Sequence, residues 1–174
     1  MAVSLCGFCA AELERLADLG LRRRLRRWEG PPGPRALVDG REVLVLGSND
    51  YLGLAGHPEV RAAAAAALVT HGAGSGGARL VCGNRLVHEE LEAALAAWKG
   101  AEAAVLFNAG YLANLGTIAA LVGPGDLILS DELNHASIID GCRLSRAEVR
   151  VYRHADPEHA AALLAAERAR RRPC

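Results

Sequence analysis

Polar side chains follow a short apolar run in the segment SDELNHASIIDG, residues 130–141. The run LILS that leads into it is typical of a buried strand, and the residues after His135 are typical of a helix. Ligands of α/β proteins gather where parallel strands end, so His135 is a candidate catalytic or cofactor-binding residue. The helix dipole disfavours the cationic ring there, and a neutral imidazole can stack on a flat ligand or handle a proton. An ordinary helix cap formed by Asp131 or Asn134 explains the same segment equally well.

A second candidate site is NAGY, residues 108–111, between an apolar run and a helical pattern. Backbone N–H groups at the start of that helix, near Gly110 and Tyr111, favour an anion such as a phosphate group. Gly110 permits a close approach of the ligand to the backbone, and Tyr111 offers a flat face beside it. Many turns between a strand and a helix carry a glycine, so the pattern alone does not separate a phosphate site from an ordinary turn.

The third candidate is the glycine-rich stretch GAGSGGARL, residues 72–80. It matches neither the dinucleotide-binding fingerprint nor a P-loop, because no Gly-Lys-Ser/Thr follows. Ser75 and Arg79 are the side chains in it that can bind a ligand, and a flexible surface loop is the competing interpretation. His88 is expected to support the start of the next helix. The histidines and cysteines show no metal-ligand spacing, so no metal site is predicted.

The elements before residue 100 follow from the periodicity of the apolar residues. A leucine stripe among arginines predicts a helix over residues 10–28, which the prolines and glycines after it terminate. ALVDGREVLVL, residues 36–46, predicts a β-hairpin about an Asp-Gly turn. Further helices are expected over residues 58–71 and 86–99, the second of them ended by Gly100.

Strands and helices alternate in the rest of the chain. Strands are predicted at 104–107, 127–130 and 148–152, and helices at 110–122, at 135–145 and from 156 onward. Three strand–helix units in series predict an α/β fold in which helices flank a parallel-rich sheet.

Composition and charge exclude several classes of protein. The 174 residues are 51% hydrophobic and 23% charged, which is typical of a globular domain. Twenty basic and twenty acidic side chains balance, so neither a nucleic acid nor a membrane surface is predicted as a partner. No apolar run approaches the roughly 20 residues of a membrane span, and the first residues do not form a convincing signal peptide. Five cysteines at irregular spacing fit reduced thiols in a cytoplasm, and CGFC at 6–9 is expected to lie in a loose arm.

The order of the motifs resembles the α-oxoamine synthases, which are fold-type I enzymes that use pyridoxal 5′-phosphate (PLP). The matching stretches are SNDYLGL, HPEV, GSGGARLVCGN, HEELEAALAAWKG, NAGYLANLGTI and SDELNHASIIDGCRLS. The resemblance implies the large domain of that fold, a parallel-rich sheet flanked by helices. It implies a helical arm and hairpin in residues 1–47 and the first part of the PLP-binding domain in residues 48–174.

The resemblance assigns cofactor-binding roles to three of the candidate residues. Gly110 and Tyr111 match the positions whose helix terminus holds the phosphate group of PLP. His135 matches the histidine that stacks on the pyridine ring and is also placed to assist proton transfer. PLP is therefore the cofactor that the resemblance implies, with His135 as the catalytic residue.

The implied substrate-binding residues are more widely separated along the chain. Arg22, the first arginine of LRRR, matches a residue that meets a substrate carboxylate, and an exposed arginine on a helix is the competing interpretation. Asn49 and Tyr51 match a loop that lines the site near a dimer interface. Ser75 matches the loop that closes over the site.

Within the family, the LRRR arm and the loop GSGGARLVCGN are most similar to the 8-amino-7-oxononanoate synthase branch. That resemblance implies a PLP-dependent acyltransferase of biotin biosynthesis, which condenses L-alanine with a pimeloyl thioester and releases CO2. Pimeloyl-CoA and pimeloyl carrier protein are both implied as acyl donors, and a homodimer is the implied assembly. SDELNHASIIDG fits a 2-amino-3-ketobutyrate CoA ligase equally well, so that activity is the alternative.

The family also needs a lysine that holds PLP and an aspartate that pairs with the ring nitrogen. Lys99 is the one lysine of the sequence, and it precedes the expected helix stop at Gly100, where a lysine complements the helix dipole. The 174 residues alone are therefore expected to be a truncated, inactive part of a synthase. A non-catalytic remnant of the fold that binds another protein is the competing interpretation.

Overall fold

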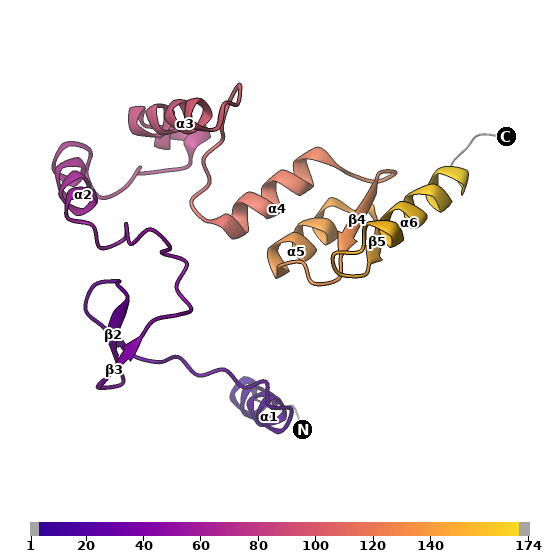
Figure 1. The fold of residues 1–174 in the computed structure, drawn as a ribbon, viewed down its shortest axis with the longest axis horizontal. Helices are drawn as coiled ribbons and strands as arrows, with labels where there is room; N and C mark the ends of the chain where they lie inside the picture. Colours follow the sequence, from indigo (N-terminus) through magenta and orange to yellow (C-terminus); the bar gives the residue numbers. More distant parts are fainter. Residues whose placement is uncertain (1–3, 171–174) are drawn as a thin grey trace. The chain divides into compact units, whose positions relative to one another are not determined.

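The computed structural model describes residues 4–170 of the chain (Figure 1). The chain divides into two compact units, Met1–Gly74 and Ser75–Cys174. The first unit holds a helix, a small antiparallel sheet and a second helix. That second helix, α2 (Pro58–His71), has the predicted bounds.

Helix α1 (Leu5–Asp18) begins the first unit. The Ser4 side chain accepts a hydrogen bond from the backbone N–H of Gly7 at 3.2 Å and so caps the helix. Gly20, with a φ of 68°, takes the left-handed conformation that ends many helices, and the chain leaves α1 there. The prediction of a helix over residues 10–28 is therefore wrong at both ends. The stretch LRRRLRR is not helical, and CGFC lies inside α1 rather than in a loose arm.

A three-stranded antiparallel sheet follows, in the order β1 (Trp28–Glu29), β2 (Arg35–Val38) and β3 (Arg41–Leu44). Asp39 and Gly40 join β2 to β3 with φ angles of 50° and 76°, as a type I′ turn requires. The predicted hairpin is thus confirmed. Strand β1 was not predicted, because two residues carry no periodicity of their own.

The glycine-rich stretch opens the second unit and folds tightly. It closes into one π-helical turn, η1 (Arg79–Gly83), before helix α3 (Leu86–Lys99). A Cβ atom at Gly83 would lie 1.8 Å from the carbonyl oxygen of Gly77, so only glycine fits there. Gly100, with a φ of 64°, ends α3 as predicted.

Glu92 of α3 holds three segments of the second unit together. Its carboxylate accepts hydrogen bonds from the Arg79 guanidinium, at 2.5 and 3.0 Å, and from the backbone N–H of Leu106 at 2.7 Å. These hydrogen bonds, with that of Arg79 the strongest cause, lower the pKa of Glu92 to about 2. Because Leu106 donates to a side chain instead of a neighbouring strand, no strand forms at 104–107, and that prediction is wrong.

Helices and strands alternate after this segment. The elements are α4 (Gly110–Leu121), β4 (Leu127–Asp131), α5 (Ala136–Ser145), β5 (Glu148–Tyr152) and α6 (Pro157–Arg170). β4 and β5 pair in parallel, so the parallel sheet has two strands within residues 4–170 instead of the predicted three. The bounds of the elements from α4 to β5 otherwise agree with the prediction to within one residue. The end of the last predicted helix lies outside the described residues.

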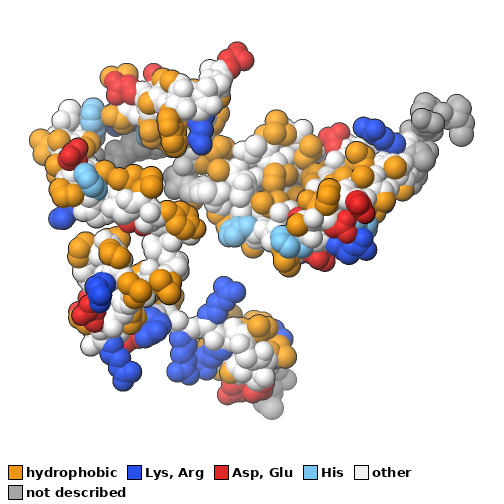
Figure 2. Space-filling model, in the orientation of Figure 1, with side chains coloured by type: hydrophobic (Ala, Val, Ile, Leu, Met, Phe, Trp, Pro, Cys, Tyr) orange, Lys and Arg blue, Asp and Glu red, His pale blue; other side chains and the backbone are white. Residues whose placement is uncertain are grey.

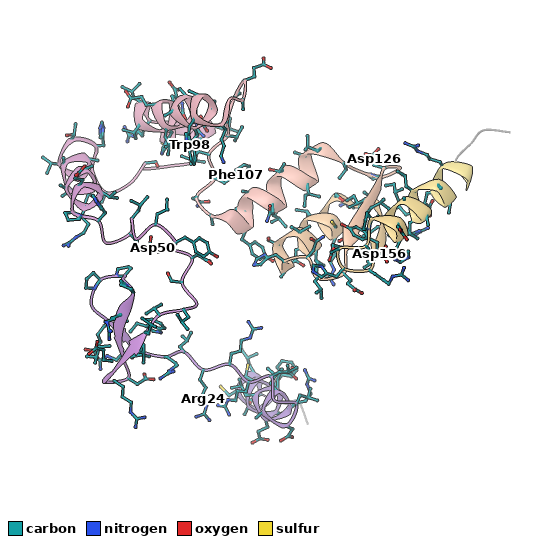
Figure 3. All side chains as sticks on the ribbon, viewed as in Figure 1. Arg24, Asp50, Trp98, Phe107, Asp126 and Asp156 are labelled. Carbon is teal, nitrogen blue, oxygen red and sulfur yellow. The ribbon has the colours of Figure 1, made fainter. Side chains whose placement is uncertain are left out.

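Helices α4 and α5 pack closely against each other (Figure 1). Gly141 of α5 is buried, and a Cβ atom there would lie 3.0 Å from Cδ1 of Ile118 and 3.2 Å from the backbone oxygen of Asn114. Phe107, which Figure 3 labels, belongs to the segment that leads into α4. Its ring lies against Gly116 of α4. Glycines on both helices therefore allow the side chains and backbones around them to approach closely.

Large hydrophobic side chains lie at the surface of both units (Figure 2). Leu25 and Leu80 are fully exposed, and the buried hydrophobic residues of the described chain are Val38, Ala96 and Cys142. Exposed apolar area of this extent is typical of surfaces that pack against further protein.

Replacing Gly141 by alanine is expected to destabilise the second unit by about 1–3 kcal/mol, because the added methyl group overpacks the α4–α5 contact. Urea denaturation followed by circular dichroism measures the change. Gly123→Ala is the matched control, since its Cβ atom meets only an ordinary contact of 4.0 Å to the backbone oxygen of Ser145. Equal denaturation midpoints for the two variants would show that the contact at Gly141 is not this close.

Candidate cofactor-binding site

The start of α4 is open to an anion. Ala109 precedes the helix in an extended conformation and offers no side-chain hydrogen bond that could cap it. A Cβ atom at Gly110 would meet no heavy atom within 4 Å, so space is available in front of the first turn. The N–H groups at the start of a helix have no partner within the helix, and the dipole adds a positive potential there. These residues therefore fit a phosphate group.

His135 is the residue that caps α5. Its Nδ1 atom accepts a hydrogen bond from the backbone N–H of Ser137 at 3.2 Å and lies 2.7 Å from the Ser137 Oγ. The alternative in which Asp131 or Asn134 caps this helix is excluded, because both side chains bind elsewhere. The Asn134 side chain donates to the Ser130 Oγ at 3.0 Å. His135 is exposed, so its ring is free to stack on a flat ligand.

Tyr111 lies against His135. The two ring centroids are 6.3 Å apart and the ring planes meet at 74°, which is an edge-to-face contact. The Tyr111 hydroxyl donates a hydrogen bond to the carboxylate of Asp140, which also pairs with Arg143 at 3.2 Å. The hydrogen bond to Asp140 raises the pKa of Tyr111, so the phenol stays neutral. The structure thus brings three predicted site residues, Gly110, Tyr111 and His135, to one place.

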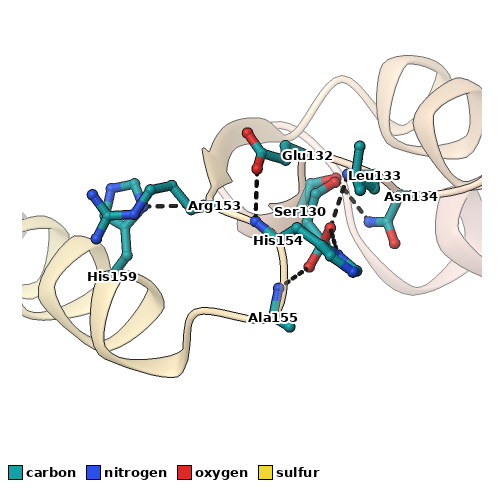
Figure 4. Close-up of polar contacts among 9 residues, drawn as sticks. Ser130, Glu132, Leu133, Asn134, Arg153, His154, Ala155 and His159 are labelled. Atoms are coloured by element: carbon teal, nitrogen blue, oxygen red, sulfur yellow. Dashed lines mark hydrogen bonds and ion pairs between the residues drawn. The ribbon is translucent and has the colours of Figure 1, made fainter.

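Asp131 fastens the segment that carries His135 to the segment after β5. Figure 4 labels its partners Leu133, His154 and Ala155. Its carboxylate accepts the backbone N–H groups of Leu133 at 2.8 Å and Ala155 at 2.9 Å, and it lies 2.9 Å from Nδ1 of His154. The N–H groups of Ala155 and Leu133, followed by His154, lower the pKa of Asp131 to about 2. The loop before the cap of α5 is therefore held at the carboxyl ends of both parallel strands.

Ser75 lies in the glycine-rich stretch, beside the segment that leads into α4. Its carbonyl oxygen accepts a hydrogen bond from the Arg85 guanidinium at 3.1 Å. His88 supports the start of α3 as predicted, because its Nδ1 accepts the backbone N–H of Arg85 at 3.1 Å. A cavity of about 520 Å³ is lined by Ser75, Gly77, Ala78, Arg79, His88, Leu106, Phe107 and Asn108. Since Asn108 is two residues before Gly110, Ser75 borders the approach to α4.

The remaining predicted site residues belong to the first unit. Arg22 is exposed in the non-helical stretch after α1, so its predicted place on a helix is wrong. Asn49 is exposed in the segment before α2. Their roles as substrate-binding residues stay predictions.

Three polar residues of the site were not singled out from the sequence. Asn114 donates to the Ser137 Oγ at 2.9 Å, and Asp140 accepts from Tyr111. These pairs lie 23 and 29 positions apart, so only the packing of α4 on α5 reveals them. The one local signal was helical spacing, which places Ser137 and Asp140 on the same face of their helix.

Neither a membrane-spanning helix nor a metal-binding cluster is found in the described part of the chain. None of the helices within residues 4–170 has the length and apolar character needed to cross a bilayer. No group of three or more His, Cys, Asp and Glu side chains among these residues is placed to hold a metal ion.

Comparisons with known proteins point to one family. Residues 41–173 match the family model described as aminotransferase class I and II. The 8-amino-7-oxononanoate synthase of Anaeromyxobacter sp. (strain K) is 57% identical over 172 residues, which cover 99% of this chain and 43% of that protein. The serine palmitoyltransferase of Sphingomonas wittichii is 36% identical, with a TM-score of 0.82 over 99% of this chain and 43% of that one. A variant of serine palmitoyltransferase from S. paucimobilis with a bound PLP–myriocin aldimine is 34% identical, with a TM-score of 0.81 over 95% of this chain and 41% of that one.

The fold is that of the fold-type I PLP-dependent transferases, and it confirms the predicted fold class. The chain belongs to the class I and II aminotransferase family. The resemblance to the α-oxoamine synthases is confirmed by the relative named 8-amino-7-oxononanoate synthase, of whose length this chain spans 43%.

Acid is expected to destabilise the second unit as the pH falls below about 4. The folded pKa of Asp131 is about 2, against an ordinary value of 3.8, so its carboxylate stabilises the fold fully above the ordinary value. That contribution is lost as the pH falls through the folded pKa. Urea midpoints between about pH 2 and about pH 7 measure the loss.

Asp131→Asn is expected to lower the urea midpoint at neutral pH. It is also expected to reduce the fall of the urea midpoint between about pH 4 and about pH 2. Glu90→Gln, at an exposed position of α3, is the control and should leave this fall of the urea midpoint unchanged. If the urea midpoint fell equally steeply with falling pH in both variants, the contacts of Asp131 would be contradicted.

Proposed function

We propose that this chain forms the phosphate-binding and ring-stacking part of the active site of an 8-amino-7-oxononanoate synthase. The observation that carries the proposal is the uncapped start of α4 at Gly110, beside the edge-to-face pair of Tyr111 and His135. The 57% identity to a relative of that name supports the choice within the family. The activity is proposed for an enzyme in which the rest of the fold joins these residues.

Each residue of the site has a proposed role. Backbone N–H groups of Gly110 and Tyr111 hold the phosphate group of PLP. The His135 ring stacks on the pyridine ring and assists proton transfer beside it. PLP, when bound, supplies an electron sink for the substrate carbon that loses a proton. Because Asp140 keeps Tyr111 protonated, Tyr111 places no negative charge beside the phosphate.

Substrate-binding roles are proposed for Arg22, Asn49 and Ser75. Arg22 binds a substrate carboxylate, Asn49 lines the site, and Ser75 lies in the loop that closes over it. The substrates are L-alanine and a pimeloyl thioester of CoA or of a carrier protein. Residues 1–47 form the arm and hairpin, and residues 48–174 form the first part of the PLP-binding domain. The exposed apolar side chains support a homodimer, because they offer area for a further protein surface.

Lys99 is the one lysine of the chain, and its position does not suit a covalent link to PLP. It lies in the last turn of α3, where its Nζ is 4.6 Å from the ring centroid of Trp98. A cation there complements the negative end of the helix dipole. We therefore expect the 174 residues alone to bind PLP non-covalently.

Binding of PLP to the 174-residue chain tests the proposed site. Gly110→Val fills the space in front of the helix terminus and is expected to weaken PLP binding about tenfold. His135→Ala removes the stacking face and is expected to weaken it about fivefold. Equilibrium dialysis measures the affinities, with Lys99→Arg in every protein so that this side chain cannot capture PLP.

Gly47→Val is the matched control for Gly110→Val. A Cβ atom at Gly47 also meets no heavy atom within 4 Å, and its φ is not left-handed. Its PLP affinity is expected to equal that of the parent chain. If Gly110→Val and His135→Ala bound PLP as tightly as the control, the site would lie elsewhere.

Turnover is expected to be absent from the 174 residues alone, because they hold no suitably placed lysine. Incubation with PLP, L-alanine and pimeloyl-CoA, followed by mass spectrometry, detects any 8-amino-7-oxononanoate. Product formation would contradict this expectation. No PLP binding, together with a stable complex with another protein, would instead favour the non-catalytic interpretation.

A further inference from the structure

A chain of hydrogen bonds runs from α4 to the ring of His135. Asn114 Nδ2 donates to the Ser137 Oγ at 2.9 Å, and that Oγ lies 2.7 Å from Nδ1 of His135. Ser137 is fully buried and Asn114 is half-buried. Water therefore has little access to the middle of this chain, and the partners have no ready replacement.

The donor groups fix the direction of these hydrogen bonds. The backbone N–H of Ser137 can only donate, so its acceptor, Nδ1 of His135, carries no proton. Asn114 donates to the Ser137 hydroxyl, which leaves the single hydroxyl proton for the same Nδ1. Nδ1 thus shares its single lone pair between the hydroxyl and the N–H of Ser137, and the neutral ring keeps its own proton on Nε2.

We propose that Ser137 and Asn114 are positioning residues that hold His135 as the Nε2–H tautomer. The nitrogen on the far side of the ring from the helix cap is then a hydrogen-bond donor. Nε2 has no free lone pair, so His135 acts on an oxygen of a bound ligand by donating a hydrogen bond. Which ligand oxygen it meets rests on the proposed function, whereas the tautomer does not.

The ring nitrogens of His135 report the tautomer directly. Nitrogen NMR of the chain without PLP, with labelled histidine and at about pH 8 where histidine is neutral, separates protonated from unprotonated nitrogens. The His135 signals are identified by their loss in His135→Gln. In the parent chain, Nδ1 is expected at the position of an unprotonated nitrogen and Nε2 at that of a protonated one.

Asn114→Asp reverses the direction of the hydrogen bonds, because it replaces a donor by an acceptor of nearly the same shape. The new carboxylate accepts a hydrogen bond from the Ser137 hydroxyl, so a lone pair of the Oγ faces Nδ1. The fraction of His135 that carries its proton on Nδ1 is therefore expected to rise. Ser137→Ala removes the hydroxyl, and both signals are expected to move toward the average of the two tautomers. If Ser137→Ala does not fold, Asn114→Asp still decides the question.

Ser145→Ala is the matched control. Ser145 is also buried on α5, but its Oγ donates to the backbone oxygen of Cys142 at 2.7 Å. Its tautomer signals are expected to equal those of the parent chain. A protonated Nδ1 in the parent chain, or unchanged signals in Asn114→Asp, would overturn the proposal. Because no PLP is present, the result is independent of whether the chain binds PLP.

Discussion

The close packing of α4 on α5 is the contact on which the site depends. Gly141 lets the second helix approach the backbone of Asn114 without a side chain between them. Because the two helices begin side by side, the first turn of α4 and the cap of α5 present Tyr111 and His135 together. The bonds from Asn114 to Ser137 and from Tyr111 to α5 cross the same contact. The orientation of the imidazole is therefore set by helix packing, not by a mobile loop.

Two carboxylates fix the irregular segments around this helix pair. Glu92 accepts the backbone N–H of Leu106, and Asp131 accepts those of Leu133 and Ala155. In a sheet, such N–H groups would bond to a neighbouring strand. Here a charged acceptor replaces the strand, and charged acceptors form the stronger hydrogen bonds. The approach to α4 and the approach to α5 thus gain a defined conformation without regular secondary structure.

Local signals in the sequence predicted the elements whose ends depend on a few neighbouring residues. The Asp-Gly turn and Gly100 need a left-handed backbone, and the structure has it at both places. The leucine stripe predicted too long a first helix, because the left-handed Gly20 interrupts a periodicity that continues beyond it. The strand at 104–107 failed because the partner of Leu106 is a carboxylate 14 positions earlier. The sequence left open whether Asp131 or Asn134 caps α5, because these are the usual residue types, and the fold uses His135 as the cap.

The uncapped start of α4 has a thermodynamic consequence. A helix normally satisfies its first N–H groups with a side-chain cap or with water, and Ala109 provides no such cap. An anion bound at Gly110 would itself be the missing cap. The anion binds only when the first turn is helical. Binding therefore shifts the equilibrium away from the frayed turn and stabilises the helical turn by mass action. Amide hydrogen exchange in that turn would therefore slow as the ligand concentration rises.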